Sequence, residues 1–250
     1  MKRVAVAAAV LVPLLATSLP ALAQPVGVRF AEGITRGFPV LRGPGGERLA
    51  QGELVQVPRG DRIDSRMVFH FRDGSVYDER VVFSQNGVFT LHAYSLVQQG
   101  PAFPETLQAH VDRDTGRYHV RYRADADSPE EMLEGRIDLP ADVYNGLLTT
   151  LIKNLTPGAS ARVQIVAFTP KPRLVTMLLA PGAEESVTVG EMALPAIRYR
   201  LEPQLGFLTS FLVADVPVAR CWILGGEAPA FLRFEGPLFF MGPIWRIELS

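Results

Sequence analysis

Histidine and cysteine side chains are the first candidates for chemistry in this sequence. They are His70, His92, His110, His119 and the single cysteine, Cys221. No two histidines stand at the spacings of two or four residues that are typical of metal ligands, and one cysteine supplies no pair of thiolates. His110 shares a predicted strand face with Asp112, and His119 follows on the next strand, so these groups could lie close together. Polar side chains on a solvated face are the more ordinary outcome, and we expect no metal site and no cofactor.

Motifs for nucleophilic catalysis are missing from the sequence. It contains no Gly-x-Ser-x-Gly elbow, and Cys221 has no histidine near it. Because Trp222 and Ile223 follow Cys221, we interpret this cysteine as a small buried apolar residue. We therefore expect that the protein is not an enzyme. A hydrolase whose residues come together from separate strands is the less favoured alternative.

Large aromatic side chains gather near the C-terminal end of the sequence. They are Phe231, Phe234, Phe239, Phe240 and Trp245. Aromatic residues mostly belong to the core, but they can also line a hydrophobic concavity that holds one small ligand. Either interpretation requires secondary-structure elements that bring these side chains to one surface.

One segment has a helical pattern. Residues 139–155 read LPADVYNGLLTTLIKNL, and their apolar side chains recur at spacings of three and four, which predicts a helix from Pro140 to Leu155 with one apolar stripe. Proline suits the first helical position, and Thr156-Pro157-Gly158 ends the helix. A stripe this wide must pack against another surface, and the flanking strands are its only candidate partners.

Strand patterns account for most of the remaining chain. Residues 63–72 alternate, with Met67, Phe69 and Phe71 on one face. Asp73-Gly74 and Asn86-Gly87 are strong hairpin signals, so strands at 63–72, 75–85 and 88–97 are predicted to form an antiparallel meander. Further hairpin loops are predicted at 43–46 and 114–116. After Gly158 the predicted strands are 161–169, 173–179, 186–189, 196–202, 206–216, 219–224, 231–234 and 244–249.

These elements predict a mainly β fold. The strands are predicted to form a highly curved antiparallel sheet with the shape of a half-barrel or barrel. This sheet packs on the one amphipathic helix. Residues 24–250 are predicted to be a single domain with the helix at about 140–155. A split near residue 155 into two β-halves is the alternative.

The N-terminus has the three parts of a secretory signal peptide. Lys2 and Arg3 are followed by the apolar run Val4–Leu15 and by the small-residue cleavage signal Ala21-Leu22-Ala23. Cleavage after Ala23 would remove residues 1–23, and we expect the mature protein in the periplasm, with no transmembrane segment. The formal charge of the chain is −1, which gives no electrostatic reason to expect binding to nucleic acid.

The order of the elements resembles that of a known group of folds. An export signal, a meander, one helix opened by Leu139-Pro140-Ala141-Asp142 and a second run of strands resemble the β-half-barrels of bacterial lipoprotein-localisation carriers, and of uncharacterised exported proteins thought to share that shape. The segment Phe234–Leu238 is similar to the closing strands of those uncharacterised families. The resemblance covers most of the mature chain as element order, without a specific motif. It implies the fold and an apolar cavity, and it assigns no role to any residue.

We therefore expect a non-catalytic protein that binds an apolar or lipid-like molecule in the concavity of its sheet. The alternative is an envelope protein that recruits another protein through an exposed strand edge or aromatic patch. The ligand contacts expected from the helix are Val143, Leu147, Leu148, Leu151 and Ile152. Those expected from the strands are Phe69, Phe71, Phe89 and Leu91.

Overall fold

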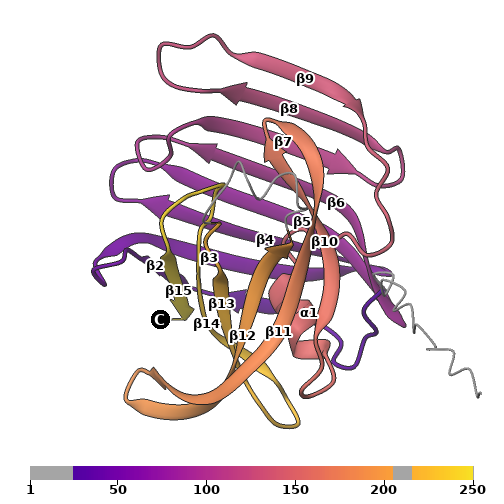
Figure 1. The fold of residues 1–250 in the computed structure, drawn as a ribbon, viewed down its shortest axis with the longest axis vertical. Helices are drawn as coiled ribbons and strands as arrows, with labels where there is room; N and C mark the ends of the chain where they lie inside the picture. The colour runs from indigo at the N-terminus through magenta and orange to yellow at the C-terminus, as the bar shows by residue number, and fades with distance from the viewer. Residues whose placement is uncertain (1–24, 205–215, 250) are drawn as a thin grey trace, which may run out of the picture.

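The computed structural model describes residues 25–204 and 216–249. These residues form the strands and the helix labelled in Figure 1. The strands are β1 (Thr35–Gly37), β2 (Pro39–Arg42), β3 (Arg48–Arg59), β4 (Arg62–Phe71), β5 (Val76–Asn86), β6 (Val88–Gln99), β7 (Thr106–Asp112), β8 (Arg117–Arg123), β9 (Glu131–Arg136), β10 (Ala161–Thr169), β11 (Lys171–Val189), β12 (Met192–Gln204), β13 (Ala219–Leu224), β14 (Ala230–Gly236) and β15 (Trp245–Leu249), and the helix is α1 (Leu148–Asn154). The predicted signal peptide, and the strand predicted over 206–216 except for its last residue, lie outside the described residues.

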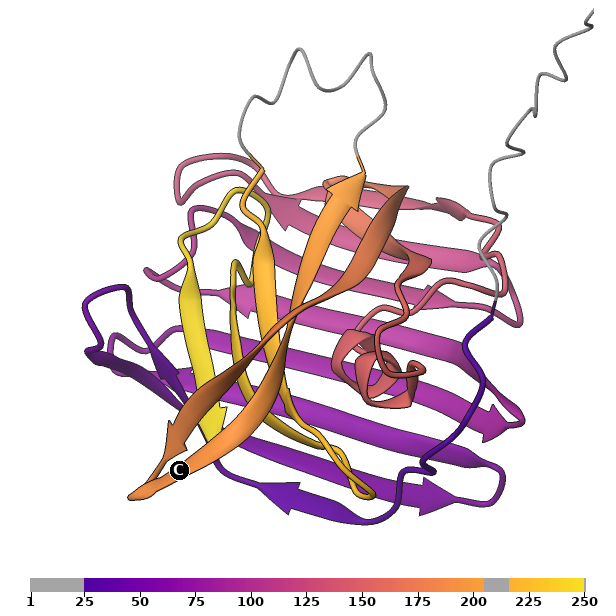
Figure 2. The ribbon, with the colours of Figure 1, turned by 60° about the horizontal axis from the view of Figure 1, so that its bottom comes forward.

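The described strands belong to one antiparallel sheet. Its order is β10-β11-β12-β13-β14-β15-β2-β3-β4-β5-β6-β7-β8-β9, with β1 paired to β3. Figure 2 shows the sheet folded over on itself, so that β10–β15 cross in front of the layer formed by β2–β9. The helix α1 lies between the two layers. The predicted mainly β fold, with a strongly curved antiparallel sheet packed on one helix, is confirmed.

The hairpins predicted from short turn signals are also confirmed. β4, β5 and β6 form the meander, with turns at Gly74 and Gly87. These two glycines have φ angles of 87° and 76°, a left-handed conformation that tight hairpin turns require and that glycine adopts without strain. The loops predicted at 43–46 and 114–116 join β2 to β3 and β7 to β8.

The helix predicted from Pro140 to Leu155 is wrong in its first half. The observed helix, α1, is seven residues long and begins only at Leu148. Gly146 has a φ of 69°, which a continuous right-handed α-helix does not contain. The apolar residues before α1 are buried even so, because the segment that carries them packs into the same core.

In the part of the chain that the structure describes, no helix has the length and hydropathy needed to cross a membrane.

The segment before α1 runs beside β10, the strand at one end of the sheet. The Tyr144 amide donates to the Gln164 carbonyl at 2.9 Å, and the Gln164 amide donates to the Asp142 carbonyl at 2.8 Å. The side chain of Asn145 makes two further hydrogen bonds to the backbone of Val166. An uncovered sheet edge can pair with other chains. These bonds cover part of the β10 edge, and they outweigh the helical pattern of the same residues.

Arg113 ties the β7–β8 hairpin to the same segment. Its guanidinium group donates to the carbonyl oxygens of Leu91, Leu139 (2.6 Å) and Pro140 (2.9 Å). Burial lowers the pKa of Arg113 below its usual value, but a guanidinium stays charged in proteins. The Arg113 side chain therefore satisfies three backbone acceptors and holds the segment before α1 against β6.

The prediction of two separate strands at 173–179 and 186–189 is wrong. Both are parts of β11, which pairs with β12 on either side of an irregularity between Pro181 and Glu184. A bulge bends a strand and increases its twist without ending it. The result is the long twisted hairpin that extends to the lower left in Figures 1 and 2.

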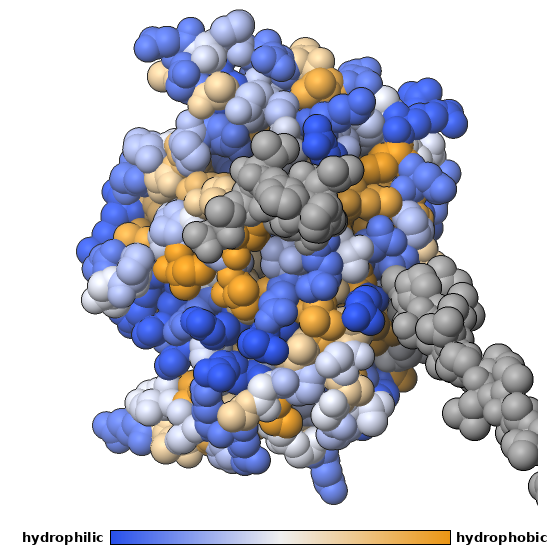
Figure 3. All heavy atoms as spheres, in the orientation of Figure 1, coloured by the Kyte–Doolittle hydropathy of each residue, from blue (hydrophilic) through white to orange (hydrophobic). Residues whose placement is uncertain are grey.

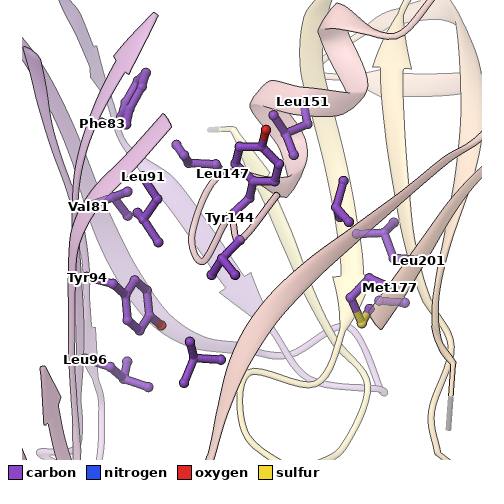
Figure 4. Close-up of a cluster of buried hydrophobic side chains, with 14 of the residues drawn as sticks. Val81, Phe83, Leu91, Tyr94, Leu96, Tyr144, Leu147, Leu151, Met177 and Leu201 are labelled. Carbon is purple, nitrogen blue, oxygen red and sulfur yellow. The ribbon is translucent and has the colours of Figure 1, made fainter. Parts of the chain in front are cut away.

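The main core fills the space between the layers. Figure 4 shows side chains of β5 and β6 on one side, side chains of β11 and β12 on the other, and the segment around α1 between them. The largest fully buried apolar side chains are Tyr144, Phe69, Phe83, Phe89, Leu41, Leu91, Leu147, Leu151, Ile152, Leu179 and Leu201. Burial of this many large side chains supplies most of the driving force for folding.

The C-terminal aromatic residues divide between core and surface. The ring of Trp245 lies 5.5 Å from that of Phe71, 6.0 Å from Phe103 and 5.7 Å from Phe239, measured between centroids. Trp245 is buried, whereas Phe240 is 55% exposed. The aromatic group is therefore chiefly an extension of the core, and Phe240 is its surface member.

Candidate ligand site inside the sheet

The predicted ligand contacts lie in one packed cluster. Phe71 is 8% exposed, and Leu148 is partly exposed and packs against the edge of the cluster. The others are at most 1% exposed: Val143, Leu147, Leu151, Ile152, Phe69, Phe89 and Leu91. The structure thus brings the helix and strand residues together as the sequence predicts. Their role as ligand contacts stays a prediction.

A group of polar side chains lies on the inner face of β5 and β6, beside this apolar cluster. We call Tyr77, Glu79, Tyr94 and Gln98 the Glu79 cluster. The Tyr94 hydroxyl donates to Glu79 Oε1 at 2.9 Å, and the Tyr77 hydroxyl donates to the same oxygen at 3.4 Å. Gln98 lies directly opposite Tyr77 in the pairing of the two strands. The inner face therefore carries a carboxylate, two phenols and an amide side by side.

Strand alternation and ring packing position the Glu79 cluster. Glu79 has the same parity on β5 as Tyr77, which is 5% exposed, so both point inward. The ring of Tyr94 stacks on Phe168 at 6.2 Å with an interplanar angle of 8°, and that of Tyr77 lies 6.5 Å from Phe103. Sequence reasoning missed this cluster. Asp78, Glu79 and Arg80 are consecutive charged residues, so the alternation pattern does not show which of them points inward.

Burial dominates the electrostatics of the cluster. It raises the pKa of the Glu79 carboxyl above its usual value, although the hydrogen bonds from Tyr94 and Tyr77 act in the opposite direction. It also raises the pKa of both tyrosines well above their usual value, with the Glu79 charge adding to the effect. The two phenols therefore remain protonated donors at neutral pH, and Glu79 is the group whose charge can change.

The cluster has hydrogen-bonding capacity that the protein does not use. The side chain of Gln98 is 1% exposed, and its Nε2 has no hydrogen-bond partner. Leaving a buried donor unpaired costs about 1–3 kcal/mol, and native proteins seldom do so without a bound water or ligand. Both tyrosines donate to Oε1 of Glu79, so Oε2 is available to a donor from outside the cluster.

Gly146 lies close to Glu79 and to Val81. Gly146 is exposed, and Glu79 keeps part of its accessible surface although Tyr77, Tyr94 and Gln98 around it are nearly fully buried. A Cβ atom on Gly146 would lie 3.4 Å from Glu79 Cδ and would overlap a methyl group of Val81. The lack of a side chain at residue 146 thus lets this segment pack closely against Val81 and Glu79 of β5.

Replacing Glu79 by glutamine is expected to change how stability depends on pH. The folded protein raises the pKa of Glu79 above its usual value of 4.5, so the unfolded chain loses this proton at a lower pH than the folded protein does. The wild-type protein therefore loses stability as the pH rises from the unfolded-state pKa through the folded-state pKa, and the Glu79→Gln variant does not.

Thermal unfolding between pH 4 and pH 8 measures this effect. The melting temperature of Glu79→Gln should exceed that of the wild type at pH 7, and the difference should shrink toward pH 4. Glu131→Gln, which changes an exposed carboxylate on β9, is the matched control. A difference between Glu79→Gln and the wild type that stays constant with pH would contradict the assignment.

A surface hollow of about 360 Å³ lies on the outer face of β3, β4 and β5. Its lining combines Val55, Val57 and Val68 with charged residues. Arg59 pairs with Asp64, and Arg66 with Asp78, so much of this charge is already neutralised by neighbours. Such a surface is typical of a solvated sheet face, and we assign the ligand site to the interior instead.

Ser84, His92 and Asp114 have the order of a catalytic triad on the outer face. Ser84 Oγ lies 2.9 Å from His92 Nε2, and His92 Nδ1 lies 3.9 Å from Asp114 Oδ1. A triad requires a hydrogen bond between the base and the carboxylate, and a nucleophile that the substrate can reach. The second distance is too long for a hydrogen bond, and Ser84 is only 7% exposed. These three residues therefore do not form a working nucleophilic site.

The remaining histidines and the cysteine follow the sequence interpretation in part. Cys221 is fully buried, as predicted, and burial raises the pKa of its thiol well above the usual value. His110 and His119 lie directly opposite each other on β7 and β8, which confirms that they are close. Among residues 25–204 and 216–249, no three histidine, cysteine or carboxylate side chains are grouped so that they could hold a metal ion.

Comparison with known proteins finds similarity in structure but no match to a family model or a curated protein. A crystal structure of a β-barrel-like protein of the domain of unknown function DUF1849 from Brucella abortus is similar to it, with a TM-score of 0.44 and 10% sequence identity. The similarity covers 91% of this chain and 97% of the other.

Proposed function

We propose that this protein binds, without catalysis, an amphipathic small molecule whose polar end meets the Glu79 cluster. The unpartnered, nearly fully buried Nε2 of Gln98, close to a partly accessible buried carboxylate, carries this proposal. A pocket that is mostly apolar with a few convergent polar groups is typical of small-molecule sites. The polar end of the ligand accepts from Gln98 and donates to Oε2 of Glu79.

The surroundings of the cluster favour an apolar remainder of the ligand. Leu96 and Leu107, at 7% and 3% exposure, and Phe168, at 8%, belong to the buried cluster on that side of the sheet. The centre of the concavity is already filled by the side chains of the segment around α1. We therefore assign the ligand to the end of the interior near β5, β6 and β7.

The proposal includes export to the periplasm, for which the three-part N-terminal pattern is the support. In that compartment a carrier for amphipathic molecules would keep an apolar group out of water between two membranes. Measuring the N-terminal residue of protein from the periplasmic fraction tests this part. Cleavage after Ala23 is the expected result, and recovery of the uncleaved chain from the cytoplasm would contradict it.

Mass spectrometry of an organic extract tests the binding proposal. Protein purified without detergent should release an amphipathic molecule in near-stoichiometric amount. Gln98→Leu removes the unpartnered donor, so it should retain less than a tenth of that amount while keeping the wild-type circular dichroism spectrum.

A fluorescent probe gives a second measurement. N-phenyl-1-naphthylamine, which is apolar and has one N–H donor, should bind with micromolar affinity, and Glu79→Leu should weaken binding at least tenfold. Glu131→Gln on the exposed surface is the control and should bind like the wild type. An empty extract together with probe binding unchanged in Glu79→Leu and Gln98→Leu would overturn the proposal.

A second candidate function is recruitment of a protein partner at β9. This strand ends the described sheet, and Met132 on it is 68% exposed. Figure 3 shows small groups of hydrophobic residues bordered by hydrophilic ones on one side of the molecule. Free strand edges pair with extended segments of other chains. The purified protein should capture a partner protein from envelope extract. This capture should be lost in Met132→Lys but retained in Met192→Lys, which changes an exposed methionine in the β11–β12 hairpin.

A further inference from the structure

Four polar side chains form a straight row on the outer face of β6, β7, β8 and β9. Ser95 lies opposite His110, His110 opposite His119, and His119 opposite Glu134. Directly opposed residues of an antiparallel pair have their Cβ atoms about 4.5–5.5 Å apart. The two imidazoles are therefore neighbours, with one hydrogen-bonding residue beyond each.

The outer members of the row engage the Nδ1 atom of each histidine. Ser95 Oγ lies 2.8 Å from His110 Nδ1, and Glu134 Oε1 lies 3.1 Å from His119 Nδ1. A carboxylate only accepts, so Glu134 holds the proton of a neutral His119 on Nδ1 and leaves the lone pair on Nε2. The Ser95 hydroxyl can accept from His110 in the same way. Neither Nε2 has a hydrogen bond within the described residues.

The hydrogen bond at each Nδ1 is a feature that these two residues share with metal-ligating histidines. Metal-ligating histidines almost always donate their second nitrogen to a carboxylate or another oxygen, which fixes the tautomer and the ring orientation. We propose that His110 and His119 form a two-histidine chelate for a divalent transition-metal ion through their Nε2 atoms. Water molecules complete the coordination, because His119 is exposed and lines a surface hollow.

Ligand type favours copper among the candidate ions. Imidazole nitrogen suits Cu²⁺, Zn²⁺ and Ni²⁺, and affinity for a given site is highest for Cu²⁺ in the usual order of these ions. Asp112, two residues from His110 on the same face, adds negative charge. Arg117 and Arg121 flank His119 on β8, and Arg136 lies opposite Arg117 on β9. All three oppose a cation, but Arg121 is paired with Glu130 at 2.9 Å. Arg117→Gln should therefore raise the affinity for the ion.

Titration of the untagged protein with Cu²⁺ tests this inference. Isothermal titration calorimetry should detect one site, and electron paramagnetic resonance should show coupling to two imidazole nitrogens. His110→Gln and His119→Gln should each weaken binding at least tenfold and remove that coupling. Glu134→Gln should weaken it less, since it acts only by orienting His119.

His70→Gln is the matched control. His70 is an exposed histidine on β4, and its replacement should leave both measurements unchanged. Wild-type affinity and spectrum in the double variant His110→Gln/His119→Gln would overturn the inference, and so would the lack of binding by wild-type protein at equimolar Cu²⁺. Melting curves of the variants in the absence of metal establish that each is folded.

Discussion

Gly146→Ala is expected to destabilise the protein by about 3 kcal/mol. Two effects add at this residue. Alanine in the left-handed conformation costs about 1–2 kcal/mol, and Gly146 has a φ of 69°. The new methyl group would also overlap Val81 Cγ2, and over-packing of this kind typically costs about 1–3 kcal/mol more. Val81 is a buried residue with a stiff side chain, so it cannot easily move aside.

Gly158→Ala separates the two effects. Gly158 has a similar φ of 79°, but nothing lies within 4 Å of the position of its missing Cβ. It should therefore show the backbone term alone, about 1 kcal/mol. Urea denaturation of both variants measures the difference. Equal losses of stability in the two would contradict the close approach of residue 146 to β5.

Arg113→Met is expected to cost a similar amount, about 3 kcal/mol, for a different reason. Methionine keeps much of the length of the side chain but leaves the carbonyl oxygens of Leu91, Leu139 and Pro140 without their donor. Each lost hydrogen bond from a charged group is worth about 1.5–3 kcal/mol, and removal of the half-buried charge returns part of that. The segment before α1 should also exchange its amide hydrogens faster.

Arg117→Met, on the other side of the same hairpin, is the control. Arg117 is exposed, so its replacement should change stability by less than about 0.5 kcal/mol. Urea denaturation gives the stability of both variants, and hydrogen exchange at Tyr144 reports on the segment itself. Wild-type exchange there in Arg113→Met would show that the three hydrogen bonds do not hold the segment in place.

Local rules predicted the strands of this protein well. The alternation of Met67, Phe69 and Phe71, and the glycines at 74 and 87, determine the β4–β6 meander almost without reference to the remaining chain. These signals are strong because a strand face and a tight turn each depend on only a few neighbouring residues. The mainly β class follows directly from them.

The errors occurred where distant contacts override local patterns. Residues 140–147 have helical spacing, but the edge of β10 offers Asp142 and Tyr144 backbone partners that a helix would exclude. In β11, Pro181 looks like the end of a strand, and pairing with β12 continues past it through a bulge. Neither partner strand can be identified from the sequence of the segment itself.

The candidate site was predicted only in its apolar part. The helix and strand residues of the predicted concavity do meet in one core. Glu79, Tyr94 and Gln98 were not identified, because their meeting depends on the register of β5 against β6 and on the bulge between Val82 and Phe83. A register difference of one residue would send Glu79 to the solvent face, and sequence patterns do not determine it that closely.

The position of β15 in the sheet has a consequence for biosynthesis. β15 pairs with β2, and Arg42 bonds to Glu248, 206 residues later in the chain. The two halves of the sheet can therefore join only after residues 245–249 have left the ribosome. Contacts of such long range form slowly. Until then β2 presents an open edge that can aggregate. Chaperones that hold nascent chains unfolded would protect the β2 edge during this interval.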